Sequence, residues 1–137
     1  MNQAVEDINH SVTIEAPIEE VWERISTARS LSQWFMPNDL IARPGYQFHL
    51  QSPFGPSPCT VLSVLPEKEL SFRWDEDGWI VTFSLSTMND LTIFTVNHGG
   101  WKNAYDLVPK ANQPQGQVRN FMSQGWYGML QKLKKTF

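Results

Sequence analysis

The sequence predicts an α+β fold in which one curved antiparallel sheet of about six strands wraps around a long C-terminal helix. Three observations predict it. Apolar and polar residues alternate over residues 8–15 and over most of residues 46–97, and a period of two is typical of half-buried strands. Short turns separate these segments, which favours antiparallel neighbours. Residues 118–137 instead carry apolar side chains at helical spacing.

The first elements are a strand and two short helices. Residues 8–15 form the strand, and Pro17 suits the first turn of the helix that follows. One face of that helix is apolar through Ile18, Val21, Trp22 and Ile25. A second short helix is expected over residues 31–35, where Pro37 ends it. We expect the pair of helices to wrap the edge of the sheet.

The middle of the chain predicts a meander of short strands. They are expected at residues 46–51, 59–65, 70–74, 79–86 and 91–97. Residues 52–58 hold three prolines and a glycine, which predicts a loop. Residues 99–117 are expected to be irregular, with one or two helical turns over residues 101–107.

The last element is the clearest. Its apolar residues fall on one helical stripe over about five turns: Val118, Phe121, Met122, Gly125, Trp126, Met129, Leu130, Leu133 and Phe137. This stripe must cover the apolar face of the sheet. If the helix stands off from a curved sheet, the gap becomes a pocket. Glycine leaves a groove on a helical face, and methionine adapts to irregular space, so the stripe suits either a pocket or a plain core.

Length and composition limit the function. The 137 residues fit one domain spanning residues 1–137, and the net charge of -3 with scattered basic residues disfavours nucleic-acid binding. A single cysteine, Cys59, excludes an internal disulfide and a cysteine zinc site. No run reaches the ~18 apolar residues of a membrane span. Residues 1–7 lack the apolar region of a signal peptide, so a cytoplasmic location is expected.

No set of residues predicts catalysis or metal binding. The three histidines, His10, His49 and His98, lie in different segments and match no ligand spacing. Catalysis also needs an oriented partner for a histidine, so structural roles are favoured. We therefore expect no catalytic residue, no metal and no cofactor, and we regard the chain as more consistent with a binding protein than with an enzyme.

Several local motifs cover nearly the whole chain in a familiar order. They are Ala16-Pro17 with Val21-Trp22, Gln33-Trp34-Phe35, Arg43-Pro44-Gly45 with Phe48, Val61 to Val64, Leu70 to Trp74, Val81-Thr82-Phe83, and His98 to Trp101 with Gly125-Trp126. With the order of elements, these motifs resemble the helix-grip (SRPBCC) superfamily of START domains, the birch-pollen allergen and polyketide cyclases. Within it the chain is similar to the activator of heat-shock-protein-90 ATPase homologue-like family.

The resemblance implies a cavity between the sheet and the last helix that holds lipids, sterols, flavonoid-like rings or polyketides. Strand and helix periodicity suggests which side chains surround it: Trp22, Trp34, Phe48, Phe72, Trp74, Val81, Phe83, Met122, Trp126 and Met129. His98 and Tyr46 are candidates for polar contacts with the ligand. Residues 34–36, three large apolar side chains in a row, could gate the mouth or plug the end of the sheet.

The expected function is therefore binding of a small hydrophobic molecule, lipid-like or aromatic, with a role in stress as a further expectation. Two alternatives stay open. One is a cyclase- or hydrolase-type enzyme that uses the same cavity and needs an ionisable pair inside it. The other is a protein-interaction or co-chaperone-like module, or a homodimer, that uses Leu62, Ile80 and Ile93 on the outer face of the sheet. The chaperone-activating role belongs to larger relatives with an additional N-terminal domain, so the family name alone does not assign it here.

Overall fold

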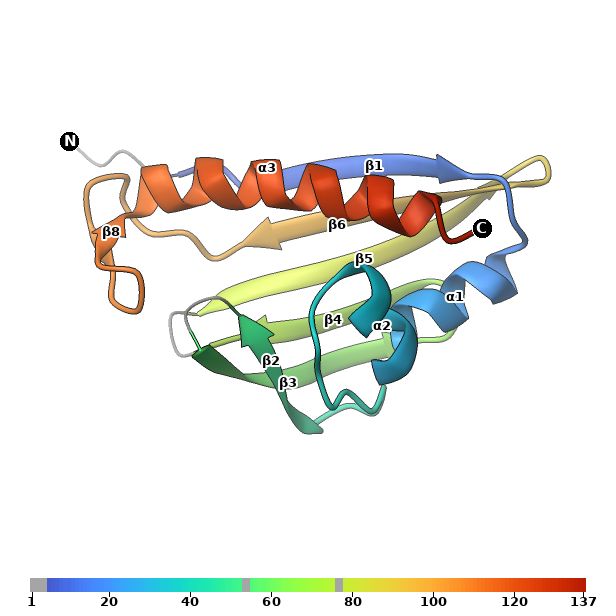
Figure 1. The fold of residues 1–137 in the computed structure, drawn as a ribbon, viewed down its shortest axis with the longest axis horizontal. Helices are drawn as coiled ribbons and strands as arrows, with labels where there is room; N and C mark the ends of the chain where they lie inside the picture. The colour runs from blue at the N-terminus through green and yellow to red at the C-terminus, as the bar shows by residue number, and fades with distance from the viewer. Residues whose placement is uncertain (1–4, 53–54, 76–77) are drawn as a thin grey trace.

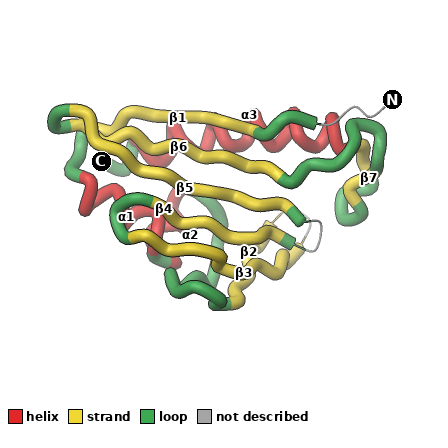
Figure 2. The backbone as a smooth tube through the Cα atoms, turned by 180° about the vertical axis from the view of Figure 1, so that it is seen from behind, coloured by secondary structure: helices red, strands yellow, loops and turns green. Residues whose placement is uncertain are grey.

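The computed structural model describes residues 5–52, 55–75 and 78–137. They form two layers: a twisted sheet, and three helices that all lie on one of its faces (Figure 1). This is the predicted α+β helix-grip fold. In Figure 2 the sheet faces the viewer, and no helix covers this outer face within the described residues.

The main sheet has six strands, as predicted. They are β1 (Ile8–Ile14), β2 (Gln47–Ser52), β3 (Gly55–Leu65), β4 (Glu69–Trp74), β5 (Trp79–Met88) and β6 (Leu91–Gly99). Their order is β1-β6-β5-β4-β3-β2, with antiparallel neighbours throughout. The strands from β2 to β6 form a meander joined by short turns. β1 pairs with β6 and is the edge strand on that side of the sheet.

The helices are α1 (Ile18–Ser26), α2 (Ala28–Trp34) and α3 (Gln115–Lys134). The second begins three residues before the predicted start because Thr27 caps it, its side chain accepting a hydrogen bond from the Ser30 amide. The long helix α3 runs along β1 and β6 (Figure 1). None of the described helices is both long and apolar enough to cross a bilayer.

The core lies between the sheet and the helices and is rich in aromatic rings. Its largest fully buried side chains include Trp34, Trp126, Phe48, Phe72, Phe83 and Phe94. Trp34 at the end of α2 packs against Phe83 and Phe94, with ring centroids 5.8 Å away in each case. Its Nε1 donates to the Arg24 carbonyl oxygen at 2.9 Å. Trp34 therefore fills the core between the sheet and the helices and does not form a gate.

Two predicted loops differ in the structure. Residues 55–58 belong to β3 in spite of Pro56 and Pro58, because this part of the strand pairs with β2 before β4 joins at Cys59, so missing amides are tolerated. The predicted loop residues 53–54 lie outside the described residues.

The second difference concerns residues 101–107, which form no helical turn. Instead β7 (Leu107–Val108) pairs with β8 (Gln113–Pro114) in a small hairpin. The carbonyl oxygens of Ala104 and Asp106 accept hydrogen bonds from the first amides of α3. They are therefore not used in hydrogen bonds of a helix over residues 101–107. Asn112, with a φ of 54°, supplies the left-handed residue of the turn.

The outer face of the sheet carries some of the apolar side chains that the sequence assigned to it. Leu62 and Ile80 are 44% and 43% exposed, and Ile93 is half-buried. Single exposed apolar residues are common on folded proteins, so this face by itself indicates no partner.

Candidate functional site

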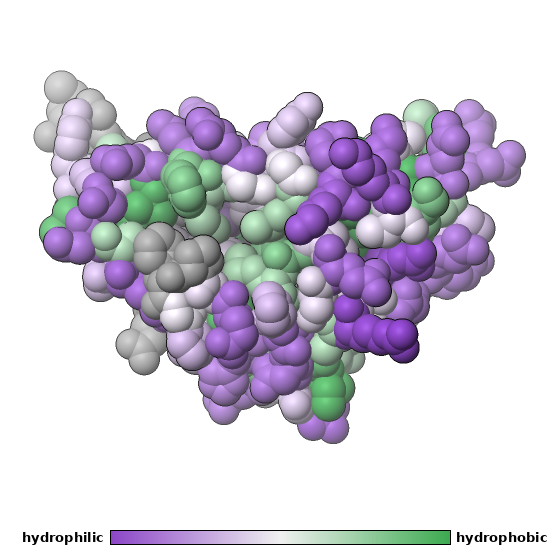
Figure 3. Space-filling view, in the orientation of Figure 1, coloured by the Kyte–Doolittle hydropathy of each residue, from purple (hydrophilic) through white to green (hydrophobic). Residues whose placement is uncertain are grey.

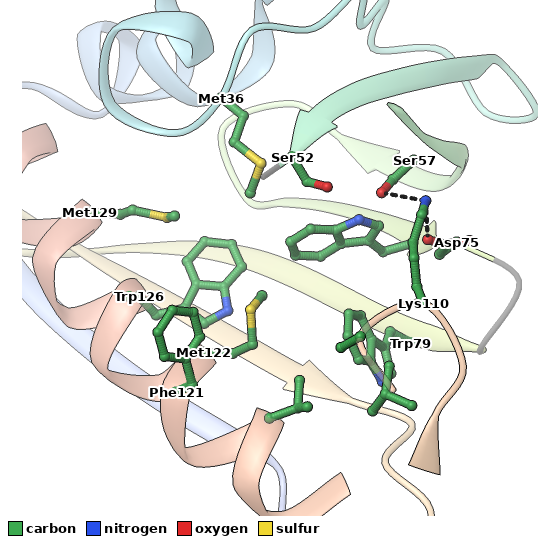
Figure 4. A pocket seen from close by; sticks show the side chains of 15 residues that line it. Met36, Ser52, Ser57, Asp75, Trp79, Lys110, Phe121, Met122, Trp126 and Met129 are labelled. Atoms are coloured by element: carbon green, nitrogen blue, oxygen red, sulfur yellow. Dashed lines mark hydrogen bonds and ion pairs between the residues drawn. The ribbon is translucent and has the colours of Figure 1, made fainter. Parts of the chain in front are cut away.

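A cavity of about 110 Å³ lies between α3 and the strand ends that meet near the β7–β8 hairpin (Figure 4). An engineered closed cavity of about 150 Å³ holds benzene, so this cavity, which is open on one side, approaches the size of a single ring. Seven of its fifteen lining residues are aromatic or sulfur-containing: Met36, Trp74, Trp79, Phe121, Met122, Trp126 and Met129. The other lining residues are Ser52, Ser57, Asp75, Val108, Lys110, Ala111, Val118 and Gly125.

Strand alternation and helical spacing aim these side chains at one space. Trp74 ends β4 and Trp79 begins β5, and they are paired across the hairpin with ring centroids 5.6 Å apart. From α3, Met122, Trp126 and Met129 point toward them at spacings of four and three residues. Figure 4 shows Met36 approaching from the opposite side, after the end of α2.

The cavity meets the surface beside α3. Phe121 is 66% exposed and Gly125 is exposed as well, although both line the cavity. A Cβ at Gly125 would have no heavy atom within 4 Å, so nothing in the described residues covers this point. Figure 3 shows apolar surface gathered in the middle of this face, with hydrophilic side chains around it. The cavity is therefore open to solvent along the exposed side of the helix.

The hairpin end of the cavity is closed by Lys110. Its Nζ donates to Ser57 Oγ at 3.1 Å and to Asp75 Oδ2 at 2.8 Å (Figure 4). It also donates to the Pro56 carbonyl oxygen at 2.9 Å. One ammonium group thus joins the β7–β8 hairpin to β3 and to the end of β4. The predicted cavity was nearly all apolar, and this ion pair at its end was not foreseen.

His98 does not line the cavity itself but lies in the core next to the lining residue Trp126, which it positions. The indole Nε1 of Trp126 donates to His98 Nδ1 at 3.0 Å. The histidine ring is fully buried and stacks between Trp74 and Trp101, with centroids 5.5 Å and 4.8 Å away. Because Nδ1 accepts this bond, the proton of the neutral ring is on Nε2. His98 was expected to donate a hydrogen bond to a ligand, but the structure has it accept one from a wall residue.

Burial also decides the charge of His98. Desolvation lowers its pKa from 6.5 to about 3, so the ring is neutral at physiological pH. Its Nε2 and the Nε1 of Trp79 have no hydrogen-bond partner among the described residues, and neither atom is exposed to the cavity. The site thus contains no histidine that is placed to exchange protons with a bound molecule.

The sequence profile described as Activator of Hsp90 ATPase homolog 1-like protein matches residues 15–137. The chain belongs to this family. The solution structure of Bacillus halodurans protein BH1534 is similar, with a TM-score of 0.91 and 47% sequence identity over 98% of each chain. No curated protein matches the chain.

Two more distant structures share the fold of this family member. The Aha1 dimer from Colwellia psychrerythraea has a TM-score of 0.73 at 19% identity, over 95% of this chain and 94% of that one. DynU16, described as a putative protein in the dynemicin biosynthetic locus, has a TM-score of 0.73 at 22% identity, over 96% of this chain and 46% of that one. At these identities the likeness shows the fold alone.

The structure brings four of the twelve expected ligand-binding residues together around the cavity. They are Trp74, Met122, Trp126 and Met129. Five others fill the core away from it: Trp34, Phe48, Phe72, Val81 and Phe83. Their side chains face inward, as the alternation predicts, but other side chains already occupy the space above them.

The remaining three expected residues lie elsewhere. Trp22 is half-buried on α1 and packs on the edge of the core. Tyr46 precedes β2 and lies under the Arg43 guanidinium, whose Cζ is 5.5 Å from the centre of the tyrosine ring. His98 lies in the core next to Trp126, as described above.

Several lining residues were not expected. Trp79 had a sequence signal, because it shares the alternation of Val81 and Phe83 on β5. The hairpin residues Val108 and Lys110 had none, because a strand of two residues leaves no period to detect. Phe121 was placed on the inward stripe of α3, whereas in the structure it forms an exposed rim of the cavity.

Proposed function

We propose that the chain binds a small hydrophobic molecule in the cavity between α3 and the sheet. The observation that carries this proposal is an apolar cavity that opens at the surface beside Gly125 and is walled by aromatic rings and methionines. Apolar pockets with few polar groups are the common form of ligand sites. Membership in a family with the helix-grip fold supports the same role.

The size of the cavity sets the expected affinity. A single aromatic ring that buries about 150 Å² gains roughly 4 kcal/mol, at about 25 cal/mol per Å². This corresponds to a dissociation constant of about 1 mM. Larger rings or lipid-like chains need more room. Met36, Met122 and Met129 could provide it, because methionine side chains change conformation readily.

The six tryptophans provide a direct test of binding. In a ¹H–¹⁵N spectrum each indole N–H gives its own signal. On titration with toluene or benzyl alcohol, we expect saturable shifts at Trp74, Trp79 and Trp126, which line the cavity. Trp22 and Trp34 lie outside it and serve as internal references. Equal shifts at all the tryptophans, or none at up to 5 mM ligand, would contradict the proposal.

Two glycines of α3 offer a matched pair of variants. Both Gly125 and Gly128 are exposed, and a Cβ at either position meets no heavy atom within 4 Å, but only Gly125 lines the cavity. Leucine at either position should raise the free energy of unfolding by about 0.5–1 kcal/mol, because leucine favours helices more than glycine does. We expect Gly125→Leu to weaken ligand binding about tenfold or more, and Gly128→Leu to leave it unchanged.

The result is read from two measurements on each variant. Chemical denaturation shows whether both proteins gain stability, and the indole titration shows which of them loses binding. If Gly125→Leu and Gly128→Leu bind the ligand equally well, the ligand does not enter beside Gly125, and the cavity is not the binding site.

A further inference from the structure

The polar side chains that line the cavity are already engaged with the protein. Lys110 Nζ uses its three protons on the Pro56 carbonyl oxygen, on Ser57 Oγ and on Asp75 Oδ2. Ser52 Oγ donates to the Gly55 carbonyl oxygen at 2.7 Å. The lysine charge is thus balanced within the wall by a carboxylate at 2.8 Å.

What remains facing the cavity is almost entirely carbon and sulfur. The Nε1 of Trp126 is bound to His98, and the Nε1 of Trp79 is not exposed. Among the described lining residues no cation is left free to pair with an anion. An anionic group that entered this space would therefore lose its water at a large cost in free energy. An uncharged ring loses little water and gains the burial of its surface.

We propose that the site selects an uncharged, compact aromatic molecule and excludes the anionic counterpart of the same size. This inference rests on the proposed function and names its ligand class. Lys110 would otherwise be suited to bind an anion. Its ion pair with Asp75 leaves no free charge on the lysine for an anionic ligand. Fatty acids and aromatic carboxylates are therefore poor ligands, and uncharged ring hydrocarbons are good ones.

The test compares toluene with benzoate. The two compounds have the same ring, which carries a methyl group in toluene and a carboxylate in benzoate. Binding is followed at pH 7 through the indole N–H signals of Trp74, Trp79 and Trp126. We expect toluene to bind and benzoate to bind at least about 100-fold more weakly. Benzoate affinity equal to or above that of toluene would overturn the ligand class while leaving the proposed cavity in place. If neither compound binds, the proposed function itself is wrong, and this inference with it.

Two variants test the role of the ion pair. Asp75→Asn removes the carboxylate charge and keeps a residue that tolerates the φ of 65° at this position. Lys110 then carries an unbalanced charge, so we expect the ratio of benzoate affinity to toluene affinity to rise about tenfold over that of the unmodified protein. Lys110→Met replaces the lysine with an uncharged side chain of similar length. We expect its affinity for benzoate to stay at least about 100-fold below its affinity for toluene. No rise in the ratio of benzoate affinity to toluene affinity in Asp75→Asn would show that the internal pairing does not set the selectivity.

Discussion

Replacing Trp34 with alanine is expected to lower the free energy of unfolding by about 3–5 kcal/mol. Trp34 is fully buried where α2 ends, and it touches rings from β5, β6 and the residue that follows it. The substitution leaves a large cavity at this junction of helices and sheet. It also leaves the Arg24 carbonyl oxygen without its indole donor. Urea denaturation followed by circular dichroism measures the loss.

The matched control is Trp22→Ala. Trp22 is also a tryptophan on a short helix, but it is only half-buried and packs on the edge of the core. We expect its replacement to cost about 1–2 kcal/mol, because less surface returns to water. If Trp34→Ala costs no more than Trp22→Ala, Trp34 does not have the central packing role that the structure assigns to it.

Acid is expected to destabilise the protein through His98, beginning near pH 6.5. The unfolded chain protonates this histidine below a pKa of about 6.5, whereas burial lowers the folded pKa to about 3. Between these values the unfolded state binds one more proton than the folded state. The stability from a neutral His98 is therefore fully present above pH 6.5 and declines by about 1.4 kcal/mol per pH unit below it, down to about pH 3.

The control for this prediction is His98→Asn. The amide oxygen of asparagine can accept the Trp126 indole proton near the position of Nδ1, and it does not titrate. Free energies of unfolding from pH 7.5 to 4.5 should fall more steeply in the unmodified protein than in the variant. Carboxylates titrate in both proteins, so the difference between the two slopes reports on His98. If the free energy of unfolding falls equally steeply with decreasing pH in both proteins, His98 has the same pKa in the folded and unfolded states, and the prediction is wrong.

Most of the fold could be predicted because its signals are local. The alternation in β1 and in β4 to β6, and the helical stripe of α3, reflect which face of each element is buried. Predictions were wrong where the local signal favoured something else. Prolines in residues 52–58 suggested a loop, but a strand paired on one side tolerates them. Residues 101–107 have helical propensity, but their carbonyl oxygens cap α3.

The candidate site was predictable only in part. Alternation identifies side chains that face inward, and Trp74 and Phe72 on β4 have the same pattern. Only the first of them borders the cavity, since Phe48 and Phe83 pack against the second and leave no room there. Whether an inward side chain lines a cavity depends on the volume of its neighbours across the sheet, and that volume is not a property of one segment.

The sequence by itself determined the order of the six main strands and the three helices and the inward face of most of them, because hydrophobic periodicity is set by residues that are close along the chain. Its local motifs indicated the family. The tertiary structure alone decided that the open space lies at the hairpin end of α3 and that its lysine is neutralised. Lys110 reaches Asp75 and Pro56 across 35 and 54 positions of sequence. Contacts between such distant residues arise only when the hairpin docks on the sheet, and no local pattern encodes them.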